Sequence, residues 1–194
     1  MDSDAVTSLI FSETYMDVNA HTNDPAGVIE ADRAHVWHHL SQHKPYANGV
    51  DPRIIVEGKG LKVWDITGKE HIDAVSGGVW TVNVGYGRKR IADAVAEQLT
   101  KMCFFGGTAG TIPMSAFSEM LIDKMPGLDR VYYASSGSEA NEKAFKMVRQ
   151  ISHNFYGGKK NKILFRDRDY HGTTITTLSA GGQEERSGQY GPYT

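Results

Sequence analysis

Apolar side chains recur at intervals of three or four residues in several long stretches of the chain. This period is typical of helices that bury one face. Helix signals lie at the ends of these stretches, such as the start at Asp24-Pro25 and the stop at Pro126-Gly127. The sequence therefore predicts helices over about residues 25–40, 88–102, 113–125 and 136–151.

A different period covers residues 53–74, where apolar and polar residues alternate between glycine-containing turns at 58–60 and 67–69. Alternation with a period of two is typical of strands joined by tight turns. We expect a three-stranded antiparallel meander over 53–57, 61–66 and 70–74. Ser76-Gly77-Gly78 then marks a change of composition. It predicts a boundary between the N-terminal segment of a small domain (1–75: a frayed leader to about residue 23, a helix and the meander) and the first part of a large domain (76–194).

Segments rich in β-branched and aromatic residues flank the helix predicted after Ser136. Val131-Tyr132-Tyr133 precedes it, and Lys162 to Arg166 follows the stop signal Gly157-Gly158. A strand–helix–strand unit is parallel and right-handed. This unit predicts an α/β fold with a mainly parallel sheet flanked by helices. Residues 173–178 favour a strand by propensity but a helix by position, and both alternatives stay open.

The turn between the first of these strands and its helix is a candidate anion site. Ser136 and Glu139 form a capping box, and a helix start leaves several backbone N–H groups without partners. Ser136-Gly137-Ser138 adds two hydroxyl groups at the positive end of the helix dipole, where phosphate groups bind. The chain has neither a G-x-x-x-x-G-K-[ST] loop nor a G-x-G-x-x-G loop. From the local sequence, a phosphate site and a plain helix cap both remain open.

Aromatic residues near glycines supply further candidates. Tyr170 and His171 follow the second predicted strand, so we expect them on the same side as Ser136–Ser138, where strand ends face one crevice. The ring of Tyr170 suits either a planar ligand or a core position. Trp80 lies between glycines and suits either a pocket wall or a core position.

Two other features have competing interpretations. The adjacent aromatics Phe104 and Phe105 predict a core edge or a partner surface. His35, His39 and His43 would stack as a metal site if one helix carried all three. We favour surface histidines and expect no metal, because no cysteine or carboxylate completes the set and Pro45 predicts that the helix ends near residue 43.

Composition narrows the function classes. The 194 residues are 40% hydrophobic, which is enough for a buried core, and 21 Lys+Arg nearly balance 23 Asp+Glu. The sequence has no basic block with interleaved aromatics, so no nucleic-acid partner is expected. It shows no signal peptide, transit peptide or membrane-spanning apolar run, so no membrane partner is expected. The single cysteine, Cys103, predicts a reducing compartment, the cytoplasm.

Three motifs follow one another in the chain: Ser76 to Arg88, Ser136 to Glu142, and Tyr170-His171-Gly172. Their order and spacing resemble those of the class III (omega) aminotransferases. The resemblance runs from about His38 to the last residue and implies a fold-type I transferase that uses pyridoxal 5′-phosphate (PLP). Within that family, residues 38–44, 76–88 and 138–150 look most similar to members that use taurine.

The resemblance also implies a role for each candidate residue. Ser136, Gly137 and Ser138 would bind the cofactor phosphate, and Tyr170 would stack on the pyridine ring with His171 close by. Trp80 would line the pocket for the amine substrate. The loop that contains Phe104, Phe105 and Thr108 would lie at the interface of a homodimer or a dimer of dimers.

The implied reaction transfers an amino group from taurine, or a similar primary omega-amine, to pyruvate. Its products are L-alanine and an aldehyde, which is sulfoacetaldehyde when the donor is taurine. Two alternatives stay open: another omega-amino acid or diamine as the donor, or a non-catalytic module that binds phosphate or PLP. The discriminating assay compares taurine with β-alanine.

The same chemistry requires a lysine that forms a Schiff base and an aspartate at the pyridine nitrogen. In the family, both lie C-terminal to the region that this chain resembles. We therefore expect an N-terminal portion of a longer enzyme, with no catalytic residue of its own and no activity alone.

Overall fold

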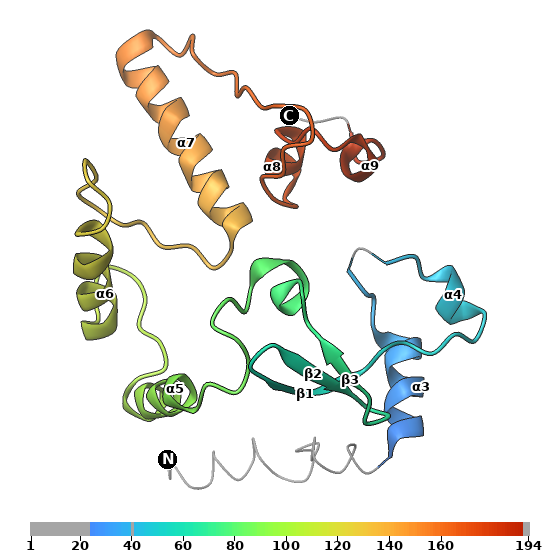
Figure 1. Ribbon diagram of the computed structural model, residues 1–194. Coiled ribbons are helices and arrows are strands. Elements are labelled where there is room, and N and C mark those ends of the chain that lie inside the picture. The colour runs from blue at the N-terminus through green and yellow to red at the C-terminus, as the bar shows by residue number, and fades with distance from the viewer. Residues whose placement is uncertain (1–23, 40, 192–194) are drawn as a thin grey trace, which may run out of the picture. The chain divides into compact units, whose positions relative to one another are not determined.

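The computed structural model describes residues 24–39 and 41–191. The chain divides into two compact units, one that ends at Phe104 and one that begins at Phe105, and Figure 1 shows their elements. The predicted leader, residues 1–23, lies outside the described residues. The predicted domain boundary after residue 75 stays a prediction.

The first unit contains an antiparallel sheet of strand order β1-β2-β3, which confirms the predicted meander. The strands are Ile55–Lys59, Lys62–Asp65 and Glu70–Ile72 (Figure 1). The carboxylate of Asp65 fixes the second turn, because it accepts the hydroxyl of Thr67 (2.6 Å) and lies 2.7 Å from Nε2 of His71. These hydrogen bonds hold the pKa of Asp65 far below its usual range.

Helix α3 (Pro25–His35) begins at the predicted signal, since Asp24 accepts the N–H of Gly27 (3.0 Å). The helix ends at His35, earlier than predicted, because Val36 is extended. Helix α4 (Lys44–Ala47) is a single turn, and α5 (Lys89–Lys101) matches its prediction. One helix therefore does not carry His35, His39 and His43. Across residues 24–39 and 41–191, no three His, Cys, Asp or Glu side chains are placed to hold a metal ion.

The second unit contains four described helices: α6 (Ile112–Ile122), α7 (Gly137–Tyr156), α8 (Ile175–Ser179) and α9 (Glu184–Ser187). Helix α7 ends where Gly157 adopts the left-handed conformation (φ 59°), as the glycine pair predicts. Helix α8 resolves the ambiguity of residues 173–178 in favour of a helix, and it contacts α7. None of the described helices combines the length and apolarity that a membrane span requires.

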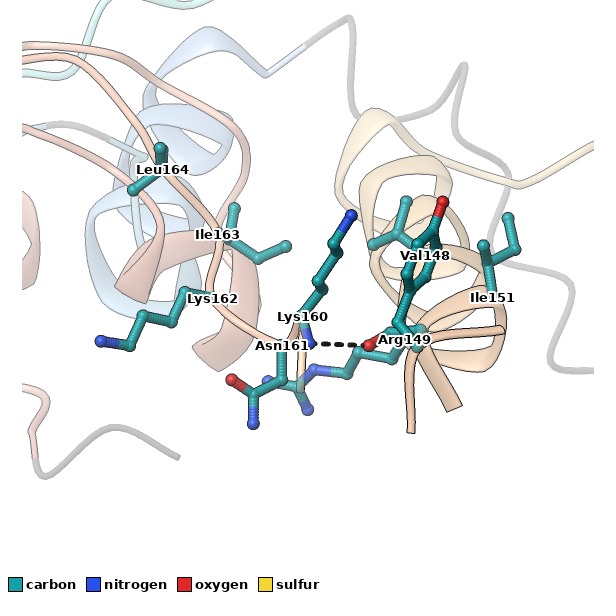
Figure 2. Close-up of a pocket in the computed structure, with 10 residues that line it drawn as sticks. Val148, Arg149, Ile151, Lys160, Asn161, Lys162, Ile163 and Leu164 are labelled. Atoms are coloured by element: carbon teal, nitrogen blue, oxygen red, sulfur yellow. Dashed lines mark hydrogen bonds between the residues drawn. The ribbon is translucent and has the colours of Figure 1, made fainter. Parts of the chain in front are cut away.

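The strands predicted on either side of α7 are wrong, because neither residues 131–133 nor residues 162–166 form a strand in the described structure. A strand requires a hydrogen-bonded neighbour, and β-propensity alone does not supply one. Figure 2 shows the second segment beside the C-terminal half of α7, where the N–H of Lys160 donates to Oγ of Ser152 (2.9 Å). A pocket of about 350 Å³ lies there, with Val148, Ile151, Ile163 and Leu164 among its apolar lining residues.

Candidate functional site

The N-terminus of α7 carries the predicted cap. Oγ of Ser136 accepts the N–H of Glu139 (3.2 Å), and the carboxylate of Glu139 accepts the N–H of Ser135 (2.8 Å). The pair is a capping box in which the glutamate reaches one residue further back than usual. The cap pairs the N–H of Glu139 and turns the carboxylate toward Ser135. It leaves the two earlier helical N–H groups free for another partner.

The loop of residues 169–174 lies against this helix start. Three side chains of α7 bind it: Oγ of Ser138 accepts the N–H of Thr173 (3.0 Å), the amide of Asn141 donates to the carbonyl of His171 (2.6 Å), and the carboxylate of Glu142 accepts the hydroxyl of Thr174 (2.6 Å). The loop that contains Tyr170 and His171 therefore lies against the helix start that contains Ser138. The contacts join a loop to a helix and do not depend on strand ends.

Gly172 makes this close approach possible. It is buried and has a φ of 142°, a conformation that residues with a side chain rarely adopt. A Cβ at this position would lie 2.6 Å from Oγ1 of Thr177 and 2.9 Å from Cα of Ser138. Thr177 is fully buried, so it has no room to move. The loop therefore requires glycine at residue 172.

The first turn of α7 presents an open set of hydrogen-bond donors. In the described part of the chain, the N–H groups of Gly137 and Ser138 have no acceptor. The hydroxyl oxygens of Ser136 and Ser138 both accept an N–H, which leaves their hydrogens available to donate. A Cβ built on Gly137 would meet nothing within 4 Å. These two N–H and two hydroxyl groups, at the positive end of a 20-residue helix, suit a phosphate.

Tyr170 and His171 have charged neighbours. The guanidinium of Arg186 lies 5.1 Å from the ring centroid of Tyr170, and about half of the tyrosine remains exposed. Nε2 of His171 lies 3.7 Å from the carboxylate of Asp169. Hydrogen bonds from the side chain and backbone of Arg166 lower the pKa of Asp169. His171 therefore faces a carboxylate that stays ionised at neutral pH.

The remaining sequence candidates are exposed within their own units. Trp80 ends η1 (Ser76–Trp80), a turn of the first unit whose inner residues are not helical, and 77% of Trp80 is exposed. Phe104, Phe105 and Thr108 are exposed as well. The sequence predictions missed Asn141 and Glu142, which hold the loop. Their spacing from Ser138, three and four residues along one helix, is the signal that places all of them on one face.

The family profile described as Aminotransferase class-III matches residues 45–193. The chain belongs to the class III aminotransferases. The chain is 62% identical over 178 residues to the hypotaurine/taurine–pyruvate aminotransferase of Paracoccus denitrificans (strain Pd 1222). The match covers 92% of this chain and 39% of that protein, so the chain spans about two fifths of the length of the curated relative. The predicted resemblance to taurine-using members is confirmed.

Solved transaminases share the fold. An (S)-enantioselective omega-transaminase from Thermomicrobium roseum is 32% identical and superposes with a TM-score of 0.82 over 87% of this chain and 38% of its own. The omega-transaminase of Pseudomonas jessenii in complex with PMP is 27% identical, with a TM-score of 0.80 over 84% of this chain and 36% of its own. These likenesses confirm the predicted fold-type I class.

Proposed function

We propose that the chain forms the phosphate-binding part of a PLP-dependent aminotransferase. The observation that carries the proposal is the open donor set of Ser136, Gly137 and Ser138, against which the loop with Tyr170 and His171 is docked. Membership of the class III aminotransferases supports PLP as the ligand. A plain helix cap accounts for the hydroxyl of Ser136 and for unpaired N–H groups in the first turn, but not for the loop that is docked on Ser138 and Asn141.

The residues fit the cofactor. The N–H groups of Gly137 and Ser138 and the hydroxyls of Ser136 and Ser138 would bind the phosphate, and Tyr170 would offer its exposed ring to the pyridine. When bound, PLP supplies an electron sink for the transfer of an amino group. The residues of this chain hold and orient it. Trp80 would line the amine pocket, and His171, fixed through its carbonyl by Asn141, would flank the ring.

The reactive lysine of the proposed enzyme lies outside these 194 residues. Lys143 is the lysine nearest to Ser138 in sequence, yet its ammonium donates to the carbonyl of Tyr133 and lies 4.2 Å from the ring centroid of Tyr132. In the described residues, no lysine forms a hydrogen bond or ion pair with a residue of the candidate site. The proposal therefore assigns this chain binding and orientation, and no turnover of its own.

The proposed reaction moves the amino group of taurine to pyruvate and yields L-alanine and sulfoacetaldehyde. The similarity to the hypotaurine/taurine–pyruvate aminotransferase of Paracoccus denitrificans supports both substrates and makes hypotaurine the second candidate donor. The proposal includes a homodimer, because the exposed pair Phe104 and Phe105 offers an apolar contact surface. It also includes a cytoplasmic location, which the exposed free thiol of Cys103 fits.

The test measures alanine formation by the complete gene product that carries this chain, with pyruvate and each of taurine, hypotaurine and β-alanine. We expect turnover with taurine or hypotaurine and at most weak turnover with β-alanine. A preference for β-alanine would contradict the assigned donor class. The 194-residue chain alone should give no alanine, and turnover by it would contradict the assignment of the lysine.

A pair of variants at one residue tests the phosphate contacts. Ser138→Glu adds a negative charge where the phosphate would lie, so the purified complete protein should lose PLP by absorbance and mass spectrometry. Ser138→Thr keeps both the N–H and the hydroxyl and should retain the cofactor. Equal PLP content in the two variants would rule out the phosphate site.

A further inference from the structure

The backbone of the turn η1 is strained. Ser76 and Trp80 both have positive φ values (61° and 55°), which are uncommon for residues with a side chain, and Gly77 and Gly78 between them are also positive (77° and 110°). Such conformations persist only where the surroundings hold them in place, and they cluster at ligand-contacting segments. The contacts that hold this turn are therefore informative.

The carboxylate of Asp73 is the centre of those contacts. It accepts the N–H of Val75 (3.1 Å), the N–H of Gly77 (2.6 Å) and the phenol hydroxyl of Tyr86 (2.6 Å). Ser76 adds a second hydrogen bond across the turn, because its hydroxyl donates to Oδ1 of Asn83 (3.1 Å). One carboxylate thus joins the start of the turn to a residue that lies beyond its end.

Tyr86 is itself fixed to the sheet. Its N–H donates to the carbonyl of Gly60 (2.9 Å), and its carbonyl accepts the N–H of Gly60 (3.1 Å). Its ring lies over Gly58, where a Cβ would come within 2.5 Å of the ring. The hydrogen bond between Asp73 and Tyr86 therefore attaches the strained turn to a rigid element.

This arrangement presents an aromatic side chain that its own unit does not cover. The indole of Trp80 has no hydrogen bond and no aromatic contact with any residue that the structure describes, and 77% of the residue is exposed. Many large apolar side chains of the described residues are exposed, so the exposure of the indole does not by itself indicate a ligand. The strained and tightly held backbone that carries the indole is what local packing does not explain, and orientation of the indole toward a ligand explains it.

We propose that Asp73 and Tyr86 are positioning residues that fix the η1 turn and thereby orient Trp80 toward the amine substrate. The inference rests on the proposed aminotransferase function. The two residues act on the substrate only through the turn and contact no reacting atom.

The test uses Tyr86→Phe in the complete enzyme, a change that keeps the ring over Gly58 and removes only the hydroxyl. Loss of a hydrogen bond to a charged group should raise KM for the amine donor about tenfold and change kcat less than about twofold. Asp73→Ala should do the same, and Asp73→Asn, which keeps an acceptor, should recover part of the loss. The matched control is Tyr46→Phe, whose hydroxyl has no hydrogen bond with any described residue.

A second measurement reports the conformation of the η1 turn and does not depend on an activity assay. In protein labelled with 5-fluorotryptophan, the 19F resonance of Trp80 is assigned by its loss in Trp80→Phe. Tyr86→Phe should shift or broaden this resonance and leave those of Trp37 and Trp64 in place. An unchanged Trp80 resonance, or a changed resonance with an unchanged KM, overturns the inference. Absence of turnover in the wild-type enzyme with every amine would instead overturn the proposed function.

Discussion

The turn around η1 and the loop of residues 169–174 both contain a glycine with positive φ and both are held by side-chain hydrogen bonds, but the bonds differ in kind. In the first, one carboxylate, Asp73, binds groups within 13 residues of itself. In the second, three side chains of α7 bind partners 30 to 35 residues away. The η1 turn is therefore held by one charged group that is close in sequence. The 169–174 loop is held by side chains that are distant in sequence, and one of them, Asn141, forms a neutral amide–carbonyl hydrogen bond.

The difference indicates how each loop responds to change. A local turn held by one carboxylate depends on the charge of that group, whereas a loop docked on a helix depends on how closely the backbones approach. We therefore expect the charge of Asp73 to decide the stability of the η1 turn, whereas the 169–174 loop, which one carboxylate and two neutral side chains hold, should respond most to steric substitutions.

The largest effect should come from Gly172→Ala. The new Cβ would lie 2.6 Å from the buried hydroxyl of Thr177 and would require a φ that alanine avoids, so we expect a loss of about 2–3 kcal/mol in the free energy of unfolding. Denaturant unfolding of the complete protein measures it. The same change at Gly137, which has free space around it, should not destabilise the helix. Equal effects at the two glycines would contradict the docked loop.

A smaller effect should follow Asn141→Ala, which removes the donor to the carbonyl of His171. We expect a loss of about 1 kcal/mol in the free energy of unfolding and weaker retention of PLP. Because the amide and the carbonyl are both uncharged, the loss should be the same from pH 7 to pH 4. Asn154→Ala, at an exposed position of the same helix, is the control and should change stability by less than about 0.5 kcal/mol.

The smallest of these effects should be the response of the η1 turn to acid. The hydroxyl of Tyr86, followed by the N–H of Gly77, lowers the pKa of Asp73. A carboxyl with a lowered pKa stabilises the folded state above its ordinary pKa of about 4, and this stabilisation is lost as pH falls through the lower folded value. Asp73→Asn should therefore lower the thermal midpoint at pH 7, and the difference from wild type should shrink below about pH 4.

Wild type and Asp73→Asn contain the same other charged groups around residue 73. His71 and Arg53 line the same pocket as Asp73 and Tyr86, and the part of their contribution that does not depend on the charge of Asp73 cancels when wild type and Asp73→Asn are compared at each pH. A difference in midpoint that does not change with pH would show that the charge of Asp73 does not hold the turn.

Features with local causes could be predicted from the sequence. The cap at Ser136, the stop at Gly157 and the turns of the meander each depend on a few neighbouring residues. The strands expected at 131–133 and 162–166 were wrong because a ladder requires a partner that propensity does not specify. Asn141 was missed because its partner, the carbonyl of His171, lies 30 residues away in the sequence. Asp73 was missed because its bond to Tyr86 forms only when the backbone of Tyr86 pairs with Gly60.

The candidate site likewise has a part that could be predicted from the sequence and a part that could not. Ser136, Gly137 and Ser138 could be identified from a capping pattern, but the pattern alone left both a phosphate site and a plain helix start open. The docking of residues 170–174 on Ser138 and the open space at Gly137 favour the phosphate site, and both are properties of the fold.

The most direct test of the phosphate site is the dissociation constant of PLP in Ser136→Asp, measured on the complete protein beside wild type. Aspartate caps a helix as well as serine does, so the thermal midpoint should stay within a few degrees of wild type. Its negative charge should nevertheless weaken PLP binding at least tenfold, and binding of pyridoxal, which lacks the phosphate, should change little. Unchanged PLP affinity in a normally stable variant would show that the start of α7 is only a helix cap.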